Sequence, residues 1–216
     1  MSDIYFGTYA RFATASKKDA GRLLGSDSLV GDVFEIEFQT EEGQRLAWLK
    51  NRFGALVGFF DASVSRRLSL FEARGWKLQA LLSFVAYSES AEGGYYWGEA
   101  VLLCYDPASE EGSDAFDAFT AKVADCMSEG VRPDVELGEA EIAKVLDSKG
   151  DWLPTKRVSL PEKKQGTAII KARRNLSEKI INYARNNNKG CSLLSWVALL
   201  ALVAGIIFGL KSCGVF

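Results

Sequence analysis

Histidine is absent from this chain of 216 residues. Its absence removes the commonest general base of enzymes and excludes serine or cysteine hydrolases that depend on it. It also excludes the usual catalytic zinc sites. The four cysteines show no CxxC spacing, and neither a GxxxxGK[ST] loop nor a GxGxxG turn is present. We therefore expect a protein that is not an enzyme and that uses no cofactor and no metal.

Proline is scarce, with four residues in all, and the first is Pro107. The proline-free part before it favours one compact domain of strands, because proline interrupts sheet pairing. A secretory signal is also lacking, since Met1 to Phe12 contains Asp3, no basic residue before Arg11 and no long apolar run. Without such a signal, the apolar end of the chain is not expected to direct attachment of a GPI anchor.

Charge is missing from the 21 positions between Lys189 and Lys211. Their apolar centre is SLLSWVALLALVAGIIFGL, residues 192–210. As a helix, 21 residues cover about 31 Å, close to the roughly 30 Å of a bilayer's hydrocarbon core. The pattern predicts a transmembrane helix at 192–210 and a short tail at 211–216. A buried core helix is the alternative, although such helices usually carry a polar stripe.

Basic residues lie mainly before this predicted span, and only Lys211 follows it. The asymmetry predicts a single-pass, tail-anchored membrane protein whose N-terminal domain faces the cytoplasm. Within the span, Ala201, Gly205 and Gly209 recur at intervals of four. Small residues on one face let two helices approach closely in lipid, so we expect transmembrane helix packing, with a possible homodimer, through these three residues.

The charges divide at residue 154. Residues 1–154 contain 15 Lys and Arg against 26 Asp and Glu, a net charge of −11, whereas residues 155–191 contain 10 against 2, a net charge of +8. We expect an amphipathic helix from Thr167 onward that lies on the membrane surface and meets anionic lipid head groups. Its basic residues are Lys171, Arg173, Arg174, Lys179, Arg185 and Lys189. A helix docked on the acidic domain and a nucleic-acid contact remain alternatives.

Alternating and apolar runs predict strands in the first half. GDVFEIEFQT, from Gly31, alternates large apolar and acidic residues, as a half-buried strand does. Further strands are expected at 45–51, 53–60, 76–87 and 95–105. An amphipathic stretch between Asp61 and Gly75 predicts a helix. The Asp61 side chain offers the acceptor that begins helices, and Gly75 is the kind of residue that ends them. After Pro107, helical spacing predicts helices at 113–130 and 138–148.

The predicted fold class is α+β: a small antiparallel β-barrel or strongly curved sheet, a few packing helices, a basic stalk and a single C-terminal transmembrane helix. The expected divisions are a β-rich domain at 1–106, a helical extension packed on it at 107–154, a basic linker with a juxtamembrane helix at 155–191, the transmembrane helix at 192–210 and the tail at 211–216.

Aromatic residues offer a candidate ligand site. Large rings supply apolar contact area together with a polar group, which suits a binding pocket. The candidates, which can equally be core residues, are Tyr5, Trp48, Tyr95, Tyr96 and Trp97.

The stretch from about Gly31 to Ser88 resembles a HIRAN domain. The resemblance rests on GDVFEIEFQ, RLAWLK, the glycine-bounded ALVGFFD, the helix SVSRRLSLFEARG and WKLQALLSFVAY, in that order. It implies a small β-barrel with one or two helices and, in some relatives, binding of single-stranded DNA ends. Phosphate binding depends on neutralising lysines and arginines, and the net charge of −11 opposes it.

Two functions follow from these observations. The first is a non-enzymatic, membrane-anchored protein whose cytosolic β-rich domain binds a protein or a small ligand. The second is a HIRAN-like module that is tethered to the membrane and binds nucleic acid, in the form of single-stranded DNA.

Overall fold

The computed structural model describes residues 4–41, 43–89, 93–107, 110–162 and 165–185. The chain forms two compact units, one ending at Arg174 and the other beginning at Asn175. Each unit is described by itself below.

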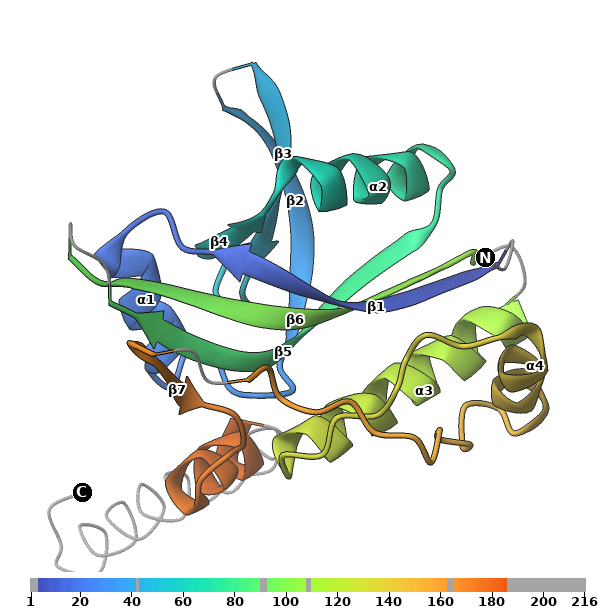
Figure 1. Ribbon diagram of the computed structural model, residues 1–216. Helices are drawn as coiled ribbons and strands as arrows, with labels where there is room; N and C mark the ends of the chain where they lie inside the picture. The colour runs from blue at the N-terminus through green and yellow to red at the C-terminus, as the bar shows by residue number, and fades with distance from the viewer. Residues whose placement is uncertain (1–3, 42, 90–92, 108–109, 163–164, 186–216) are drawn as a thin grey trace, which may run out of the picture. The chain divides into compact units, whose positions relative to one another are not determined.

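A closed antiparallel barrel of six strands forms the centre of the first unit (Figure 1). The strands follow one another in the order β2, β3, β4, β1, β6, β5, and β2 pairs again with β5 to complete the ring. A seventh strand extends the sheet beyond β5. The strands are β1 (Tyr5–Ala13), β2 (Val33–Glu41), β3 (Gln44–Lys50), β4 (Leu56–Phe60), β5 (Lys77–Ser88), β6 (Tyr95–Tyr105) and β7 (Thr167–Lys171).

Two of the six pairings in the ring, β1 with β4 and β2 with β5, are short. β1 meets β4 only through Phe12 with Phe60 and Ala13 with Phe59. β5 and β6, by contrast, pair along their whole lengths from Lys77 with Tyr105 onward. Because β4 covers only the end of β1, most of one edge of β1 has no neighbouring strand in the described residues.

Inward-facing side chains fill the barrel. Phe12, on β1, is 1% exposed and lies between β4 and β6, with Phe60 opposite it on β4 and Gly98 opposite it on β6. A Cβ added at Gly58 would come 2.6 Å from the Phe12 ring, and one added at Gly98 would overlap the same ring. These two strand glycines therefore provide the space that the ring occupies.

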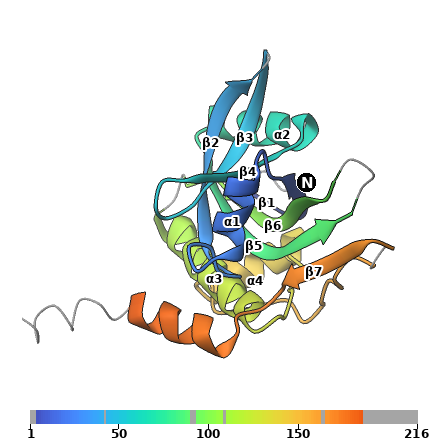
Figure 2. The ribbon, with the colours of Figure 1, turned by 90° about the vertical axis from the view of Figure 1, so that its left-hand side faces the viewer.

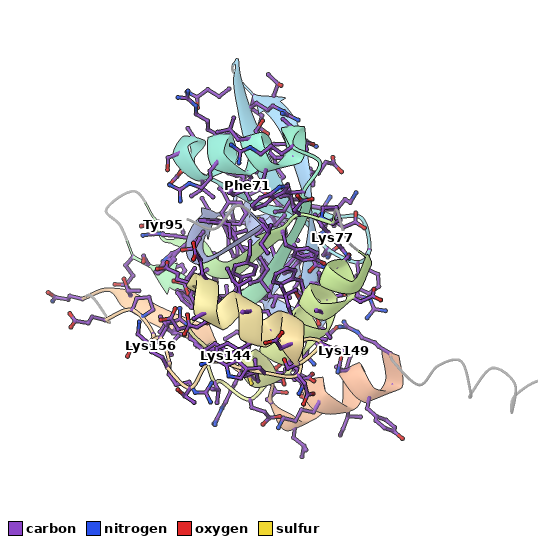
Figure 3. All side chains as sticks on the ribbon, turned by 90° about the vertical axis from the view of Figure 1, so that its right-hand side faces the viewer. Phe71, Lys77, Tyr95, Lys144, Lys149 and Lys156 are labelled. Carbon is purple, nitrogen blue, oxygen red and sulfur yellow. The ribbon has the colours of Figure 1, made fainter. Side chains whose placement is uncertain are left out.

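Helices α1 (Lys17–Leu24) and α2 (Ala62–Ala73) contribute to the same core. Figure 2 shows α1 in front of the strands, and Figure 3 shows Phe71 on the side of α2 that faces them. Leu23 of α1 and Leu68 of α2 are fully buried against the barrel residues. Each helix thus buries one apolar face and leaves its charged face in solvent.

Helices α3 (Glu110–Ser128) and α4 (Glu139–Asp147) cover the outer face of β1, β6 and β5 (Figure 1). Phe116, Phe119 and Val123 of α3 follow helical spacing and pack on the outward residues Tyr5 and Tyr105. A second core therefore lies between the barrel and these two helices.

Residues 155–174 belong to the compact first unit and are not the linker that the sequence predicts. Arg157 forms a bridge with Pro133, and β7 pairs with the end of β5, so the predicted helix from Thr167 is a strand at its start. With Arg174 as its last residue, this unit holds 22 Lys and Arg against 27 Asp and Glu, a net charge of −5. The division into an acidic domain and a basic stalk at residue 154 is therefore corrected.

In the second unit, residues 176–185 form a helix. Its start is a reciprocal cap, because the Asn175 side chain accepts from the Glu178 amide while the Glu178 carboxylate accepts from the Asn175 amide. Leu176, Ile180 and Tyr183 are exposed, at 77%, 61% and 71% of their surface.

None of the helices in the described ranges combines the length and the apolarity needed to cross a bilayer. The predicted span at 192–210 and the tail at 211–216 lie outside those ranges. The fold class is therefore corrected to a closed antiparallel barrel with packing helices. The description of the chain as a tail-anchored, single-pass membrane protein is corrected with it.

Candidate functional site

The free edge of β1 lies beside helix α2. Phe6 of β1 contacts α2 through Phe71, with the ring centroids 5.1 Å apart, and through Arg67, whose guanidinium carbon lies 5.3 Å from the Phe6 centroid. β4 reaches β1 only at Phe12 and Ala13, so α2 and not a strand is the neighbour of β1 over its first half.

The pairing of β1 with β6 determines which backbone groups face this edge. The Asp106 amide donates to the Ile4 carbonyl at 2.9 Å, and Tyr5 lies opposite Tyr105. In an antiparallel ladder, alternate residues bond to the same partner strand, so even-numbered residues of β1 bond to β6. The amides and carbonyls of Gly7 and Tyr9 therefore point toward α2, where they have no backbone partner among the described residues.

A small pocket lies between this edge and α2. Its volume is about 110 Å³, somewhat less than the roughly 150 Å³ of a cavity that holds benzene. The lining is mainly apolar, with one cation at Arg67, and consists of Phe6, Thr8, Ser63, Val64, Arg67, Leu68 and Leu102. Size and lining suit one aliphatic side chain, with an acidic group beside it.

Asp61 fixes the position of the first turn of α2. Its carboxylate accepts hydrogen bonds from the Val64 amide at 2.9 Å and from the Ser63 hydroxyl at 2.8 Å. These donors hold the pKa of the Asp61 carboxyl below its ordinary value. Because Ser63 and Val64 both line the pocket, the cap also determines the shape of one pocket wall.

The outer side of β1 is held by the segment between α3 and α4. Tyr5 donates to the Val135 carbonyl at 3.0 Å, and Tyr9 donates to the Pro133 carbonyl at 2.8 Å. Thr8 donates to the Glu136 carboxylate at 2.8 Å. Burial raises the pKa of both tyrosines, so they remain protonated donors at neutral pH. These bonds hold β1 in place although most of one edge has no neighbouring strand.

A buried ion pair lies on the same outer face. Arg132, 6% exposed, contacts the Glu99 carboxylate, and its guanidinium lies 4.4 Å from the Tyr9 ring centroid. It also donates to the Ser159 carbonyl at 2.6 Å. Burial raises the pKa of the Glu99 carboxyl, and the charge of Arg132 opposes that rise. The pair joins β6, the segment after α3 and the chain beyond residue 155.

The five aromatic residues predicted as a pocket lie in different places. Tyr5 packs on Phe116 under α3, and Trp48 packs on Phe59 on the outside of β3 and β4. Tyr95, Tyr96 and Trp97 are consecutive on β6. They lie at one end of the ladder between β5 and β6, and Lys77 lies at the other end (Figure 3). Successive strand residues face opposite sides, so even these three do not share a face.

Trp97 and Tyr95 do share one contact, with Arg11. The Arg11 guanidinium carbon lies 3.9 Å from the Trp97 ring centroid, and a guanidinium nitrogen lies 3.5 Å from the Tyr95 hydroxyl. Tyr96 packs instead against Tyr87, with centroids 5.0 Å apart. Of the five, Trp48 lines a cavity between α1 and the loop that joins β3 to β4, and Trp97 lines a separate, smaller one beside β7.

Two of the residues predicted to meet lipid are held inside the first unit. Lys171 is 9% exposed and donates to the carbonyls of Leu23, Gly25 and Ser28 at 3.3, 3.0 and 2.9 Å. Arg174 donates to the Val30 carbonyl at 2.7 Å and pairs with Asp32 at 3.1 Å. These contacts connect the end of the unit to the segment between α1 and β2.

The other predicted membrane-surface residues have separate positions. Arg173 is exposed, and Lys179 and Arg185 lie on the helix at 176–185. Lys189 and the predicted helix-packing residues Ala201, Gly205 and Gly209 lie outside the described residues.

Comparison with known proteins found no matching family model, no matching curated protein and no matching solved structure. Within the described part of the chain, no group of three or more acidic or cysteine side chains is placed to hold a metal ion. The class of protein is therefore defined by the fold and the site alone: a closed six-stranded antiparallel barrel with one strand edge open beside a helix.

Sequence reasoning missed the β1 site because its apolar contacts span distant positions. Phe6, Val64 and Leu102 come from three elements, and each fits the core pattern of its own element. The one available signal was the cluster of arginines in 66–74 on a helix whose other face is apolar.

Proposed function

We propose that this protein is a non-enzymatic binding module that takes a short extended segment of another polypeptide beside β1. The observation that carries the proposal is the edge of β1, where the backbone groups of Gly7 and Tyr9 face α2 without a strand partner. An added strand is the ligand that satisfies such alternating donors and acceptors.

The side chains beside the edge indicate which segment fits. The pocket has the size of one aliphatic side chain, and Val64, Leu68 and Phe6 supply its apolar surface. Arg67 is exposed at the same place, so a carboxylate on the bound segment would gain a charge-assisted hydrogen bond. We therefore propose a segment with an aliphatic residue next to an acidic side chain or a terminal carboxylate.

Accessibility limits the length of this segment. Gly7 is buried, Phe6, Thr8 and Tyr9 are half-buried, and Arg11 is exposed. Beyond Arg11 the edge is occupied by β4. The contact is thus restricted to a few residues, and we expect weak affinity of the kind shown by small, transient interfaces.

The test is selection of binding peptides from a displayed random library, followed by titration against variants of the full chain. Arg67→Glu reverses the charge in the pocket lining, and Arg66→Glu reverses an exposed neighbouring charge that does not line the pocket. Val64→Trp fills the pocket. We expect Arg67→Glu and Val64→Trp to weaken binding at least about tenfold and Arg66→Glu to leave it unchanged.

Amide hydrogen exchange locates the contact independently of the variants. The bound peptide should slow exchange at Gly7 and Tyr9, because their amides become hydrogen-bonded. Selected peptides that leave exchange at these two residues unchanged, or that bind the Val64→Trp chain as well as the natural one, would disprove the proposal. Failure of the library to yield any binder would count against it in the same way.

A further inference from the structure

The β1 pocket has a negative charge beside it as well as the positive charge of Arg67. Glu136, in the segment between α3 and α4, accepts a hydrogen bond from the Thr8 hydroxyl at 2.8 Å. Thr8 lines the pocket, so a carboxylate oxygen of Glu136 lies within hydrogen-bond distance of the pocket wall. Glu136 and its bond to Thr8 are both exposed to solvent, and a bound segment can therefore reach this charge.

Several contacts fix Glu136 at this position. The residue before it, Val135, is fully buried, and its carbonyl accepts from the Tyr5 hydroxyl at 3.0 Å. Gly7 of β1 permits the close approach, since a Cβ added there would overlap the Val135 carbonyl oxygen. The Glu136 amide donates to the Asp134 carboxylate at 3.1 Å. The carboxylate is thus held beside β1 before any ligand binds, which lowers the entropy cost of using it.

The charges around Glu136 leave it without a direct counter-charge. It forms no ion pair with a basic side chain in the described part of the chain. Lys156 interacts electrostatically with Glu136, but its ammonium forms its ion pair with Asp134, at 2.6 Å. Glu139 and Glu141, in the first turn of α4, add further negative charge. A basic group on a ligand would supply the missing partner.

The positive and the negative charge lie at different points along β1. The Arg67 guanidinium lies over the Phe6 ring, whereas Glu136 contacts Thr8. Phe6 and Thr8 both line the pocket and are two residues apart on one strand, which corresponds to roughly 7 Å. An extended segment laid along β1 has the same rise per residue. Its side chains therefore meet a cation at one end of the pocket and an anion at the other.

We propose that the segment bound beside β1 carries charges of both signs: an acidic side chain at the Arg67 end, an aliphatic side chain in the pocket and a basic side chain at the Glu136 end. This inference rests on the polypeptide contact proposed above and defines its ligand further. The two charged residues flank the aliphatic residue within about two positions, as the spacing of Phe6 and Thr8 requires. A segment with charges of one sign only meets a repulsive group at one end of the pocket.

The test is a set of short peptides with a central valine and threonine, glutamate or lysine at each of the two positions on either side. Fluorescence anisotropy measures the affinity of each peptide for the full chain. We expect the tightest-binding peptides to carry glutamate on one side of the valine and lysine on the other. Peptides with charges of one sign on both sides should bind at least about fivefold more weakly, because a repulsion replaces one attraction.

Reversing a charge in the protein should exchange this preference. The Glu136→Lys chain should bind peptides with glutamate on both sides most tightly, and the Arg67→Glu chain those with lysine on both sides. Glu139→Lys makes the same charge change nearby, at an exposed residue that contacts no pocket-lining side chain in the described ranges, and should keep the natural preference. An equal exchange in Glu136→Lys and Glu139→Lys would overturn the role of Glu136.

The outcomes distinguish this inference from the function on which it rests. Peptides that slow amide exchange at Gly7 and Tyr9, but bind equally well with lysine, glutamate or threonine beside the valine, would overturn this inference alone. Absence of binding by every peptide of the set would overturn both.

Discussion

At the scale of single residues, this fold depends on charged groups that are buried with their partners. Arg132 and Glu99 form an ion pair where β6, the segment after α3 and the chain beyond residue 155 meet. Lys171 donates hydrogen bonds to three backbone carbonyls. A buried charge is tolerated when a partner of opposite charge or several acceptors surround it. None of these partners is near in sequence, so their role is visible only in the folded chain.

The Arg132 and Glu99 pair gives the first prediction. Arg132→Met leaves the Glu99 carboxylate buried without its counter-charge, and we expect a loss of about 3 to 5 kcal/mol in the free energy of unfolding. Adding Glu99→Gln removes the uncompensated charge, so the double variant should recover much of that loss. Urea unfolding followed by circular dichroism measures both. A double variant that is less stable than Arg132→Met alone would contradict this explanation.

At the scale of elements, α2 and its cap organise the β1 site. The Asp61 carboxylate begins the helix and places Ser63 and Val64 in the pocket wall. The helix then lies beside the part of β1 that the short β4 does not reach. The site therefore depends on how one strand ends and on how the next helix begins.

Asp61 gives a prediction with a defined pH dependence. Asp61→Ala removes the cap and should cost about 0.5 to 2 kcal/mol in the free energy of unfolding at neutral pH. The folded-state pKa of Asp61 is lowered, so its stabilising contribution is complete above its ordinary pKa, about 3.9, and is lost as the pH falls through the lowered value. The difference between Asp61→Ala and the natural chain should thus shrink below about pH 4.

Asp61→Asn is the matched control, because asparagine caps a helix but does not titrate in this range. Its stability at neutral pH should lie close to that of the natural chain. A difference between Asp61→Ala and the natural chain that is constant from neutral to acidic pH would show that the carboxylate charge does not contribute.

Sequence patterns predicted the elements well where the pattern is local. The alternation in GDVFEIEFQT matches β2, and the Asp61 cap and the two long apolar runs match α2, β5 and β6. They failed where pairing decides the conformation. Thr167–Lys171 contains two consecutive isoleucines followed by a basic residue, which fits a helix face as well as a strand, and the neighbouring end of β5 makes it a strand. The candidate site was missed for the same reason, since it joins residues from β1, α2 and β6.

At the scale of the whole molecule, the first unit is completed by its last twenty residues. β7, Lys171 and Arg174 connect this end to β5 and to the segment between α1 and β2. Residues that composition assigns to a separate basic stalk therefore complete the compact unit.

This arrangement predicts different fates for two truncated chains. A chain ending at Arg174 retains β7 and both basic anchors, whereas one ending at Pro154 loses them. Hydrogen bonds from charged donors contribute about 1.5 to 3 kcal/mol each, and a typical domain is stable by only about 5 to 15 kcal/mol. We expect the chain ending at Pro154 to lose several kcal/mol, or to fail to unfold cooperatively in urea, while the longer chain unfolds in one transition. Equal midpoints for the two chains would disprove the role of these residues.

The ring of Phe12, enclosed by Gly58 and Gly98, has one further consequence. A six-stranded barrel is narrower than the eight-stranded carriers that enclose a cargo molecule, and here an aromatic ring occupies its middle. Such a barrel cannot serve as a container. A partner of the kind we propose is therefore met at the rim of the barrel and not inside it.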